Sequence, residues 1–334
     1  MPTDALGELP TFLAAWGVVA AAALPVFAVA RWFARREDFS PRWRPVPFRG
    51  TLLDWLLLYC VYLVVMSLAV GGLADGGVVE RFSGRGGVGL TQLRLMAAGF
   101  VALPVVLAAA AFLRRVAHDL PLTFDARALP GDVARGVVAG VVLTPAVHAV
   151  YALTRLVNAA AGGAEQQHPL ATAGAGQSPG EIVFFLLSVG LVVPWVEELL
   201  FRGVMLRWLG RRAVNAGLVF AVALLFAGTS GAAVAPELAP TLFVVVLAAL
   251  TLAVSLLGRL RPRFPARTVR AVLASSALFA AAHSAVWPSP VPLFVLACGL
   301  GYLTARTGRI TAAVVAHGLF NTVSSVILIR HAAG

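Results

Sequence analysis

Two adjacent glutamates stand inside an otherwise apolar stretch of the chain. Glu197 and Glu198 both lie inside the run 182–200, and Arg202 follows the second glutamate by four residues. An ionised side chain at the centre of a membrane helix costs on the order of 2.5–3.5 kcal/mol, so a carboxylate at that depth indicates a functional site. Such a carboxylate can act as a general base, which removes a proton from a reacting group. We therefore expect acid–base chemistry at this pair.

Helical spacing separates the two glutamates by role. If residues 182–209 form one helix, side chains four apart share a face, so Glu198 and Arg202 can form an ion pair. Glu197 then points about 100° away from that pair. We expect Glu198 and Arg202 to be a structural pair near the cytoplasmic boundary, which leaves Glu197 free for chemistry.

Two further apolar stretches contain histidines. His283 follows Phe279 by four residues, and Asn321 follows His317 by four, so the members of each pair share a helix face. At about 1.5 Å per residue, Glu197, His317 and Asn321 lie roughly 5–17 Å from the inner boundary of the bilayer, with His283 slightly deeper. These depths permit one shared site in the cytoplasmic half of the membrane.

The composition predicts the elements that must position these side chains. Of 334 residues, 60% are hydrophobic and 12% are charged, and the mean hydropathy is +0.88. Such values are typical of a protein that crosses the membrane many times. A span needs about 20 mainly apolar helical residues, because lipid offers the backbone no hydrogen-bond partners. We predict an all-α transmembrane helical bundle of about ten spans, at residues 11–30, 52–73, 95–113, 136–153, 182–200, 214–227, 241–257, 269–286, 291–305 and 310–329.

The net charge of +11 comes from arginines in the short connections between these spans. One set of alternate connections and flanks carries 21 arginines, and together with the five others these account for all 26 positively charged residues, since the chain has no lysine. This asymmetry follows the positive-inside rule, so we expect ten spans with both termini outside and no nucleic-acid partner. The acidic N-terminus favours a retained first span over a cleaved signal peptide. The five arginines on the outer side are Arg81, Arg85, Arg94, Arg155 and Arg330.

Four other residues in the predicted spans receive structural interpretations. We expect His148 to hydrogen-bond a neighbouring helix and Asp54, near a span end, to reach interfacial water. Cys60 and Cys298 are interpreted as small buried apolar residues that form no disulfide.

Three motifs carry a resemblance to a known family. Residues 197–203 read EELLFRG, residues 279–283 read FAAAH, and residues 317–321 read HGLFN. In this order they resemble the EExxxR, FxxxH and HxxxN motifs of the CPBP family of intramembrane proteases. This is the CAAX prenyl endopeptidase type II group, which includes bacteriocin-processing and immunity relatives. The resemblance covers residues 180–329, and a looser likeness begins upstream of this range, at residue 120.

The resemblance implies roles for the motif residues. Glu197 and His283 would activate a water molecule, while His317 and Asn321 would contact the oxyanion that develops on the scissile carbonyl. Glu198, Arg202 and Phe279 would support them. Together these roles predict a glutamate- and histidine-dependent hydrolysis of a peptide bond.

A metal-dependent version of the site stays open. Family members are often named metalloproteases, and Glu197, His283 and His317 are residue types that can hold zinc or another divalent ion. The sequence contains no HExxH motif, and these residues come from separate predicted helices, so their spacing neither supports nor excludes a metal. We favour a mechanism without a cofactor, because the asparagine amide at Asn321 is a good donor and a poor zinc ligand.

The resemblance also suggests a division of the chain. Residues 1–130 would form N-terminal transmembrane helices, and residues 131–330 would form the protease-like core. The interval between the first and second motifs is longer than the family's usual spacing, so we predict an inserted pair of spans at about residues 213–260. Two inserted spans return the chain to the same side and preserve the orientation of the motif helices.

The expected function is that of an intramembrane endopeptidase acting on a membrane-associated protein or peptide within the bilayer. Two alternatives are a catalytically idle scaffold or immunity protein of the same fold, and a transporter or proton-relay protein that uses the same buried groups. Arginine without lysine, together with abundant alanine, suggests a bacterial inner membrane as the location. Prenylated CAAX proteins would then not be the expected substrates.

Overall fold

The fold is built from helices in every part of the chain that the computed structural model describes, namely residues 51–77, 88–117, 126–160, 178–211, 266–283 and 286–333. The helices are α2 (Leu52–Asp75), α4 (Val88–Ala117), α5 (Leu129–Ala160), a long segmented helix, α11 (Ala266–Ala281), α12 (Pro290–Thr307) and α13 (Thr311–Ala333). The predicted all-α class is therefore confirmed for these residues.

The long segmented helix runs through the middle of the molecule. It consists of α6 (Pro179–Leu187), the π-helix η2 (Ser188–Val192), α7 (Val193–Glu198), the π-helix η3 (Leu199–Met205) and α8 (Leu206–Leu209). At its start, Ser178 and Glu181 form a capping box around Pro179. Pro194 has no N–H to donate to the preceding turn, which accounts for the widening to a π-helix directly before it.

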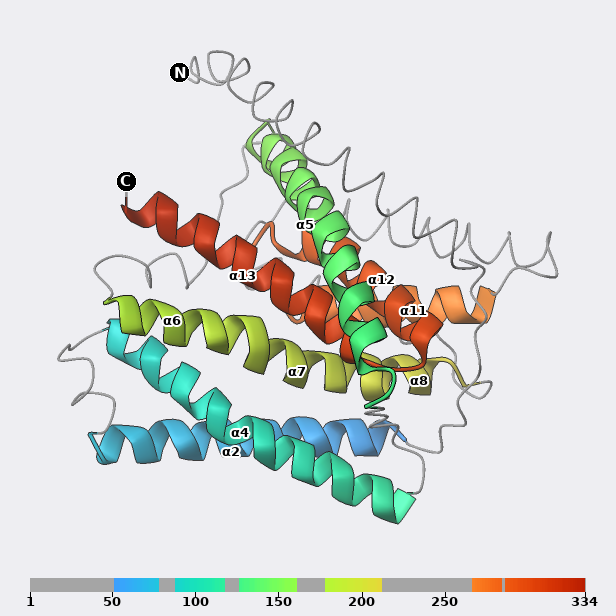
Figure 1. Ribbon diagram of the computed structural model, residues 1–334, viewed down its shortest axis with the longest axis horizontal. Helices are drawn as coiled ribbons and strands as arrows, with labels where there is room; N and C mark the ends of the chain where they lie inside the picture. The colour runs from blue at the N-terminus through green and yellow to red at the C-terminus, as the bar shows by residue number, and fades with distance from the viewer. Residues whose placement is uncertain are drawn as a thin grey trace.

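Helices pack on both sides of this central helix. α2 and α4 lie together on one side, and α13, α5 and the α11–α12 hairpin lie on the other (Figure 1). Side chains of α7 and η3, among them Val196 and Leu200, enter one core with Leu58 of α2, Val106 of α4 and Phe279 of α11. The two glutamates at the end of α7 are thus held where most of the helices meet.

Two glycines allow the central helix and α13 to cross at close range. A Cβ atom added to Gly318 of α13 would overlap the backbone oxygen of Gly190 in η2. Small residues at a helix crossing let two backbones approach closely inside a membrane. This crossing lies one residue from His317, so it sets how near that side chain comes to the central helix.

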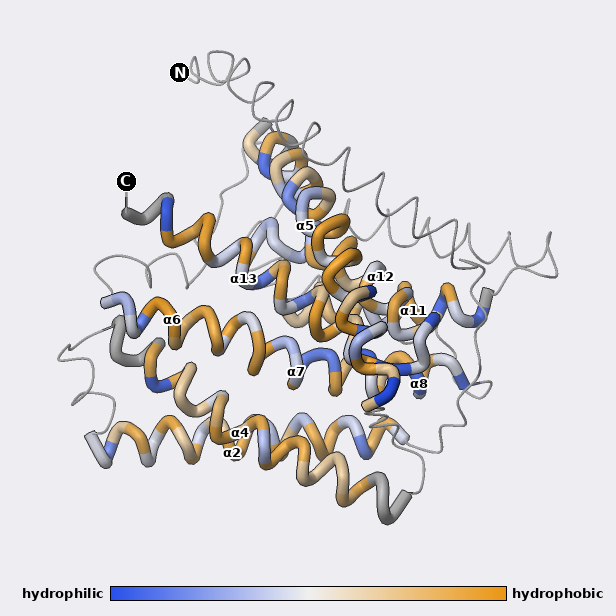
Figure 2. The backbone as a smooth tube through the Cα atoms, in the orientation of Figure 1, coloured by the Kyte–Doolittle hydropathy of each residue, from blue (hydrophilic) through white to orange (hydrophobic). Residues whose placement is uncertain are grey.

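Within the described residues, five helices are long and apolar enough to cross a membrane: Leu52–Asp75, Leu93–Leu113, Leu129–Leu156, Pro179–Leu209 and Thr311–Arg330. They coincide with five of the predicted spans. Figure 2 shows apolar residues along most of α2, α4 and α6, with polar residues concentrated near α7 and α8. By their length and composition, these helices indicate an integral membrane protein.

The remaining predicted spans have different outcomes. Those at 11–30, 214–227 and 241–257, and with them the predicted insertion at about 213–260, lie outside the described residues. α11 and α12 occupy the other two positions as helices of 16 and 18 residues, and neither is among the five apolar candidates. α11 ends at Ala281, earlier than the predicted 286, and residues 286–289 form a turn that leads into Pro290 at the start of α12. The count of ten spans stays a prediction.

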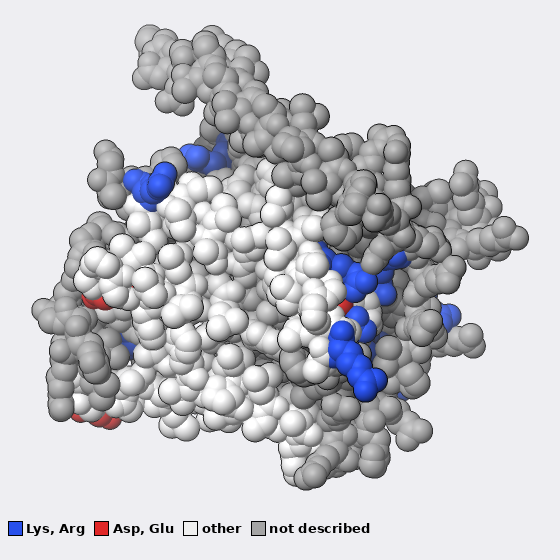
Figure 3. Space-filling view, in the orientation of Figure 1, with Lys and Arg blue, Asp and Glu red and all other residues white. Residues whose placement is uncertain are grey.

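Many of the described arginines gather at one end of the bundle. They lie at the end of α8, at the start of α11 and in the turn between α12 and α13, and Figure 3 shows blue side chains together at this end. Arg309 donates to both carboxylate oxygens of the buried Asp132 on α5, at 2.5 and 2.8 Å. Arg207 donates to the Gly308 carbonyl at 2.7 Å. These bonds fasten the α12–α13 turn to both α5 and α8.

Candidate active site

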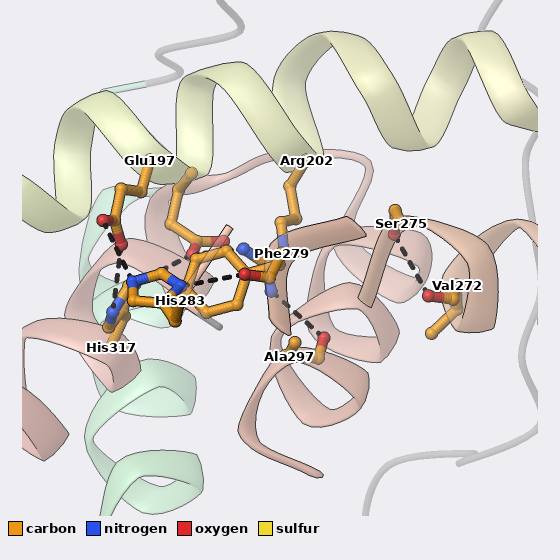
Figure 4. A network of polar contacts seen from close by, with 9 residues as sticks. Glu197, Arg202, Val272, Ser275, Phe279, His283, Ala297 and His317 are labelled. Carbon is orange, nitrogen blue, oxygen red and sulfur yellow. Dashed lines mark hydrogen bonds and ion pairs between the residues drawn. The ribbon is translucent and has the colours of Figure 1, made fainter. Parts of the chain in front are cut away.

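The ion pair expected from spacing is present at the junction of α7 and η3. Arg202 Nη1 donates to Glu198 Oε1 at 2.9 Å, and both side chains are fully buried. The same guanidinium reaches the Ala297 carbonyl of α12 at 3.3 Å and lies over the Phe279 ring at 4.6 Å (Figure 4). Arg202 therefore joins the central helix to α11 and α12.

Glu198 has a second partner that spacing along the sequence did not predict. His317 Nδ1 lies 2.9 Å from the same Oε1 atom that accepts from Arg202. A carboxylate oxygen can accept more than one hydrogen bond, so the two contacts are compatible. Residues 119 apart carry no local signal of such a contact. Glu198 therefore orients an imidazole of the third motif as well as pairing with Arg202.

Glu197 faces both histidines of the motifs, as Figure 4 shows. Its Oε1 lies 3.8 Å from His283 Nε2, and its Oε2 lies 3.6 Å from His317 Nε2. The Glu197 side chain is 24% exposed, His283 is 32% exposed and His317 is 2% exposed. Both separations exceed the length of a direct hydrogen bond, so a small group can be held beside either pair.

The hydrogen bonds at the far side of each ring identify the nitrogen that faces Glu197. His283 Nδ1 lies 2.8 Å from the Phe279 carbonyl, which can only accept, so this nitrogen carries the proton. The carboxylate of Glu198 assigns the proton to Nδ1 of His317 in the same way. In the neutral form of each ring, Nε2 therefore presents a lone pair toward Glu197.

Phe279 supports both imidazoles. Its ring centroid lies 4.8 Å from that of His283, which confirms the shared face expected from their spacing, and 5.7 Å from that of His317. His283 itself lies beyond the end of α11, in a turn rather than within the predicted span. The ring of Phe279 is therefore the fixed surface against which a turn residue is held.

Asn321 donates its side-chain amide to the Val189 carbonyl of η2 at 2.9 Å. A π-helix disturbs the regular i to i−4 pairing of the backbone, and a side-chain donor can satisfy a carbonyl there. The predicted oxyanion donor thus uses one of its two amide hydrogens to hold η2. A contact of the other hydrogen with substrate belongs to the functional proposal below.

Tyr62 of α2 is a neighbour of the site that the motifs did not indicate. It is partly buried against the core that contains Val196 and Leu199. The charge of Glu197 acts on its phenol group. An aromatic residue with a polar tip on the predicted second span was the available signal, but nothing in the sequence paired that span with residue 197.

The four residues that were expected to have structural roles all lie in described helices. His148 Nε2 lies 3.2 Å from Ser324 Oγ of α13, as expected for a contact between helices. Asp54 accepts from the backbone and side chain of Thr51 and so caps α2. Cys60 and Cys298 are free, but Cys60 is exposed, which corrects the buried interpretation, because its side chain lies outside the described core that Leu58 of α2 enters.

The zinc alternative finds no fitting ligand set in the part of the chain that the structure describes. Among those residues, no group of three or more His, Cys, Asp and Glu side chains is arranged to hold a metal ion. Glu197 faces His283 through one carboxylate oxygen and His317 through the other, at 3.8 and 3.6 Å. A reaction without a metal therefore stays a prediction.

Comparison with known proteins agrees with the motifs. The model of a family described as type II CAAX prenyl endopeptidase, Rce1-like, matches residues 179–256 and 253–323. These residues include all three motifs and the whole central helix, and the match confirms the resemblance inferred from the sequence. No curated protein and no solved structure matches the chain.

Proposed function

We propose, from the match of residues 179–323 to the model of the Rce1-like type II CAAX prenyl endopeptidase family, that this chain is an intramembrane endopeptidase. Its substrate would be a membrane-associated protein or peptide. The observation that carries the proposal is the convergence of His283 Nε2 and His317 Nε2 on the carboxylate of Glu197. Members of the family are proteases, and peptide hydrolysis needs a base beside a bound water.

Glu197 and His283 would hold and activate the water. Their facing atoms are 3.8 Å apart, so a water oxygen beside the pair can lie within hydrogen-bond length of both. Both atoms are acceptors in this arrangement, so the water donates a hydrogen to each. Glu197 takes one proton as the oxygen attacks the carbonyl carbon, and it returns that proton to the leaving amine.

His317 would stabilise the oxyanion as an imidazolium. Glu198 and Arg202 cancel each other's charge, and an ionised Glu197 leaves the cluster with one negative charge. A proton on His317 restores neutrality, since this ring contacts both carboxylates and charged groups out of water are stable only when paired. Its Nε2–H can then donate to the oxyanion, with the second amide hydrogen of Asn321 as a further donor.

The surroundings of the site support a substrate that approaches through the membrane. Glu197 and His283 are partly exposed, whereas Glu198, Arg202 and His317 are enclosed. Glu197 and His283 are therefore the members of this cluster that a substrate can reach. We place the protein in a bacterial inner membrane with the site in the cytoplasmic half, in accord with the arginines at that end, and without a cofactor or a nucleic-acid partner.

The experiment is a comparison of membrane proteomes from cells that carry the wild type, Glu197→Gln or Glu181→Gln. Glu181 is a capping residue at the start of the same helix, so its substitution is a matched control for loss of one carboxylate. We expect new protein termini in wild-type and Glu181→Gln cells and their loss with Glu197→Gln. Removal of a general base lowers rates by about 10²–10⁴-fold. Identical profiles in all three strains would contradict the proposal and favour the idle scaffold.

A further inference from the structure

The turn that carries His283 is tied to a helix outside the family match. α11 ends at Ala281, and His283 lies two residues beyond that end. Four residues further along, Trp287 donates its indole Nε1–H to Asn158 Oδ1 at 2.8 Å. Asn158 belongs to the C-terminal part of α5, and 129 residues separate it from Trp287.

This hydrogen bond is enclosed by protein. Trp287 is 4% exposed and Asn158 is 5% exposed. A buried N–H group without an acceptor destabilises the folded protein. The indole is therefore confined to the position in which Asn158 accepts its hydrogen bond. Asn158 makes further contacts of its own. Trp287 is therefore the cleaner of the two residues to alter.

Backbone hydrogen bonds in the turn connect the segment that contains Trp287 to His283. The amide of Val286 donates to the His283 carbonyl at 3.1 Å, and that of Ser289 donates to the Val286 carbonyl at 2.9 Å. On its other side, His283 is held by α11 through its own amide, which donates to the Ala280 carbonyl at 3.0 Å. The turn is thus fixed at α11 and at Asn158, with His283 between the two points.

His283 depends on such fixing more than the other imidazole does. His317 lies within α13 and is almost fully buried, whereas His283 lies in a turn and is 32% exposed. A displacement of about 1 Å in a catalytic group can lower a rate by roughly 10²-fold. A separation of 3.8 Å between His283 and Glu197 can therefore persist only if the turn is held.

We propose that the Asn158–Trp287 hydrogen bond positions His283 for reaction with water beside Glu197. The inference rests on the proposed peptidase function for its catalytic part. Asn158 and Trp287 are positioning residues, since they act on the reacting atoms only through the turn. The position of a histidine within the family-matched region therefore depends on α5, a helix outside that region.

The test uses the full-length protein in liposomes and the variant Trp287→Phe, which keeps an aromatic ring and removes the donor. Asn158→Leu and the double variant complete a mutant cycle, which isolates the hydrogen bond from effects of ring size. Ser324→Ala is the matched control, because it removes another hydrogen bond between α5 and the rest of the protein. Hydrogen–deuterium exchange of a peptide spanning residues 279–290 is measured alongside kcat and KM for cleavage of a synthetic peptide that spans a cleavage site found in the proteome comparison.

We expect Trp287→Phe to speed exchange in this peptide and to lower kcat by roughly 10- to 100-fold at nearly constant KM. In the Asn158→Leu background the same substitution should have little further effect, and Ser324→Ala should resemble the wild type. Unchanged exchange in Trp287→Phe, or faster exchange with unchanged kcat, would overturn the proposal. If the wild type cleaves nothing, the peptidase assignment fails, and exchange alone still decides whether the hydrogen bond holds the turn.

Discussion

The buried pair of Glu198 and Arg202 allows a prediction whose size follows from its surroundings. Both side chains are fully buried, and their facing atoms are 2.9 Å apart. Removing one partner of a buried ion pair costs about 3–5 kcal/mol, because the other charge stays buried without compensation. We therefore expect Glu198→Gln to lower the free energy of unfolding by about that amount, and Arg202→Gln to lower it by less, since His317 Nδ1 still contacts the Glu198 carboxylate.

The double variant distinguishes a coupled pair from two independent residues. With both charges absent, the two introduced amide side chains can hydrogen-bond each other, and no uncompensated ion remains at either position. Contacting residues show coupling of about 0.5–3 kcal/mol. We expect a value of about 2 kcal/mol or more in this enclosed site, so that the double variant loses much less than the sum of the two single losses.

The assay is reversible unfolding of the purified protein in mixed micelles, titrated with a denaturing detergent and followed by tryptophan fluorescence. Asp54→Asn is a suitable reference, since Asp54 forms only the exposed cap of α2 and should change stability by about 1 kcal/mol or less. A double variant whose loss equals the sum of the two single losses would refute the reasoning. So would a single variant as stable as the reference.

Three further predictions concern packing, a neighbouring side chain and metal. Gly318→Ala should lower the unfolding temperature in a thermal melt, because its Cβ would overlap the backbone of η2, whereas Gly180→Ala, which has open space around it, should not. Equal melting temperatures would contradict the close crossing. Tyr62→Phe should lower kcat/KM for peptide cleavage by about tenfold or less, because it removes a polar group near Glu197, while Tyr59→Phe on the same helix should have no effect. A larger effect at residue 59 would oppose the assignment. Exhaustive chelation should leave cleavage by the purified protein intact, and complete loss of cleavage that zinc restores would reverse our preference for a metal-independent reaction.

Much of the site could be predicted because helical spacing is a local property. The contact between Glu198 and Arg202 and that between Phe279 and His283 each join residues four apart, and both are present. The contact of Glu198 with His317 joins residues 119 apart, and the donation from Asn321 to Val189 joins residues 132 apart. Such contacts depend on which helices are neighbours, which hydropathy does not specify.

The fold was predictable to a similar extent. Apolar length predicts that a segment is helical, and five spans were located in this way. It does not predict where a helix widens, and both π-helices beside the glutamates were missed for that reason. It also carried the predicted span through His283 to residue 286, whereas α11 ends at Ala281.

The bonds between α5 and the family-matched region also limit how this chain can exchange parts with its relatives. Asp132 with Arg309 and Asn158 with Trp287 fasten opposite ends of α5 to that region. A chimera that joins the first half of one relative to the family-matched half of another would need compatible residues at both contacts. Substitutions at these positions should therefore be inherited in pairs, and recombination between residues 160 and 178 should succeed only between chains that share them.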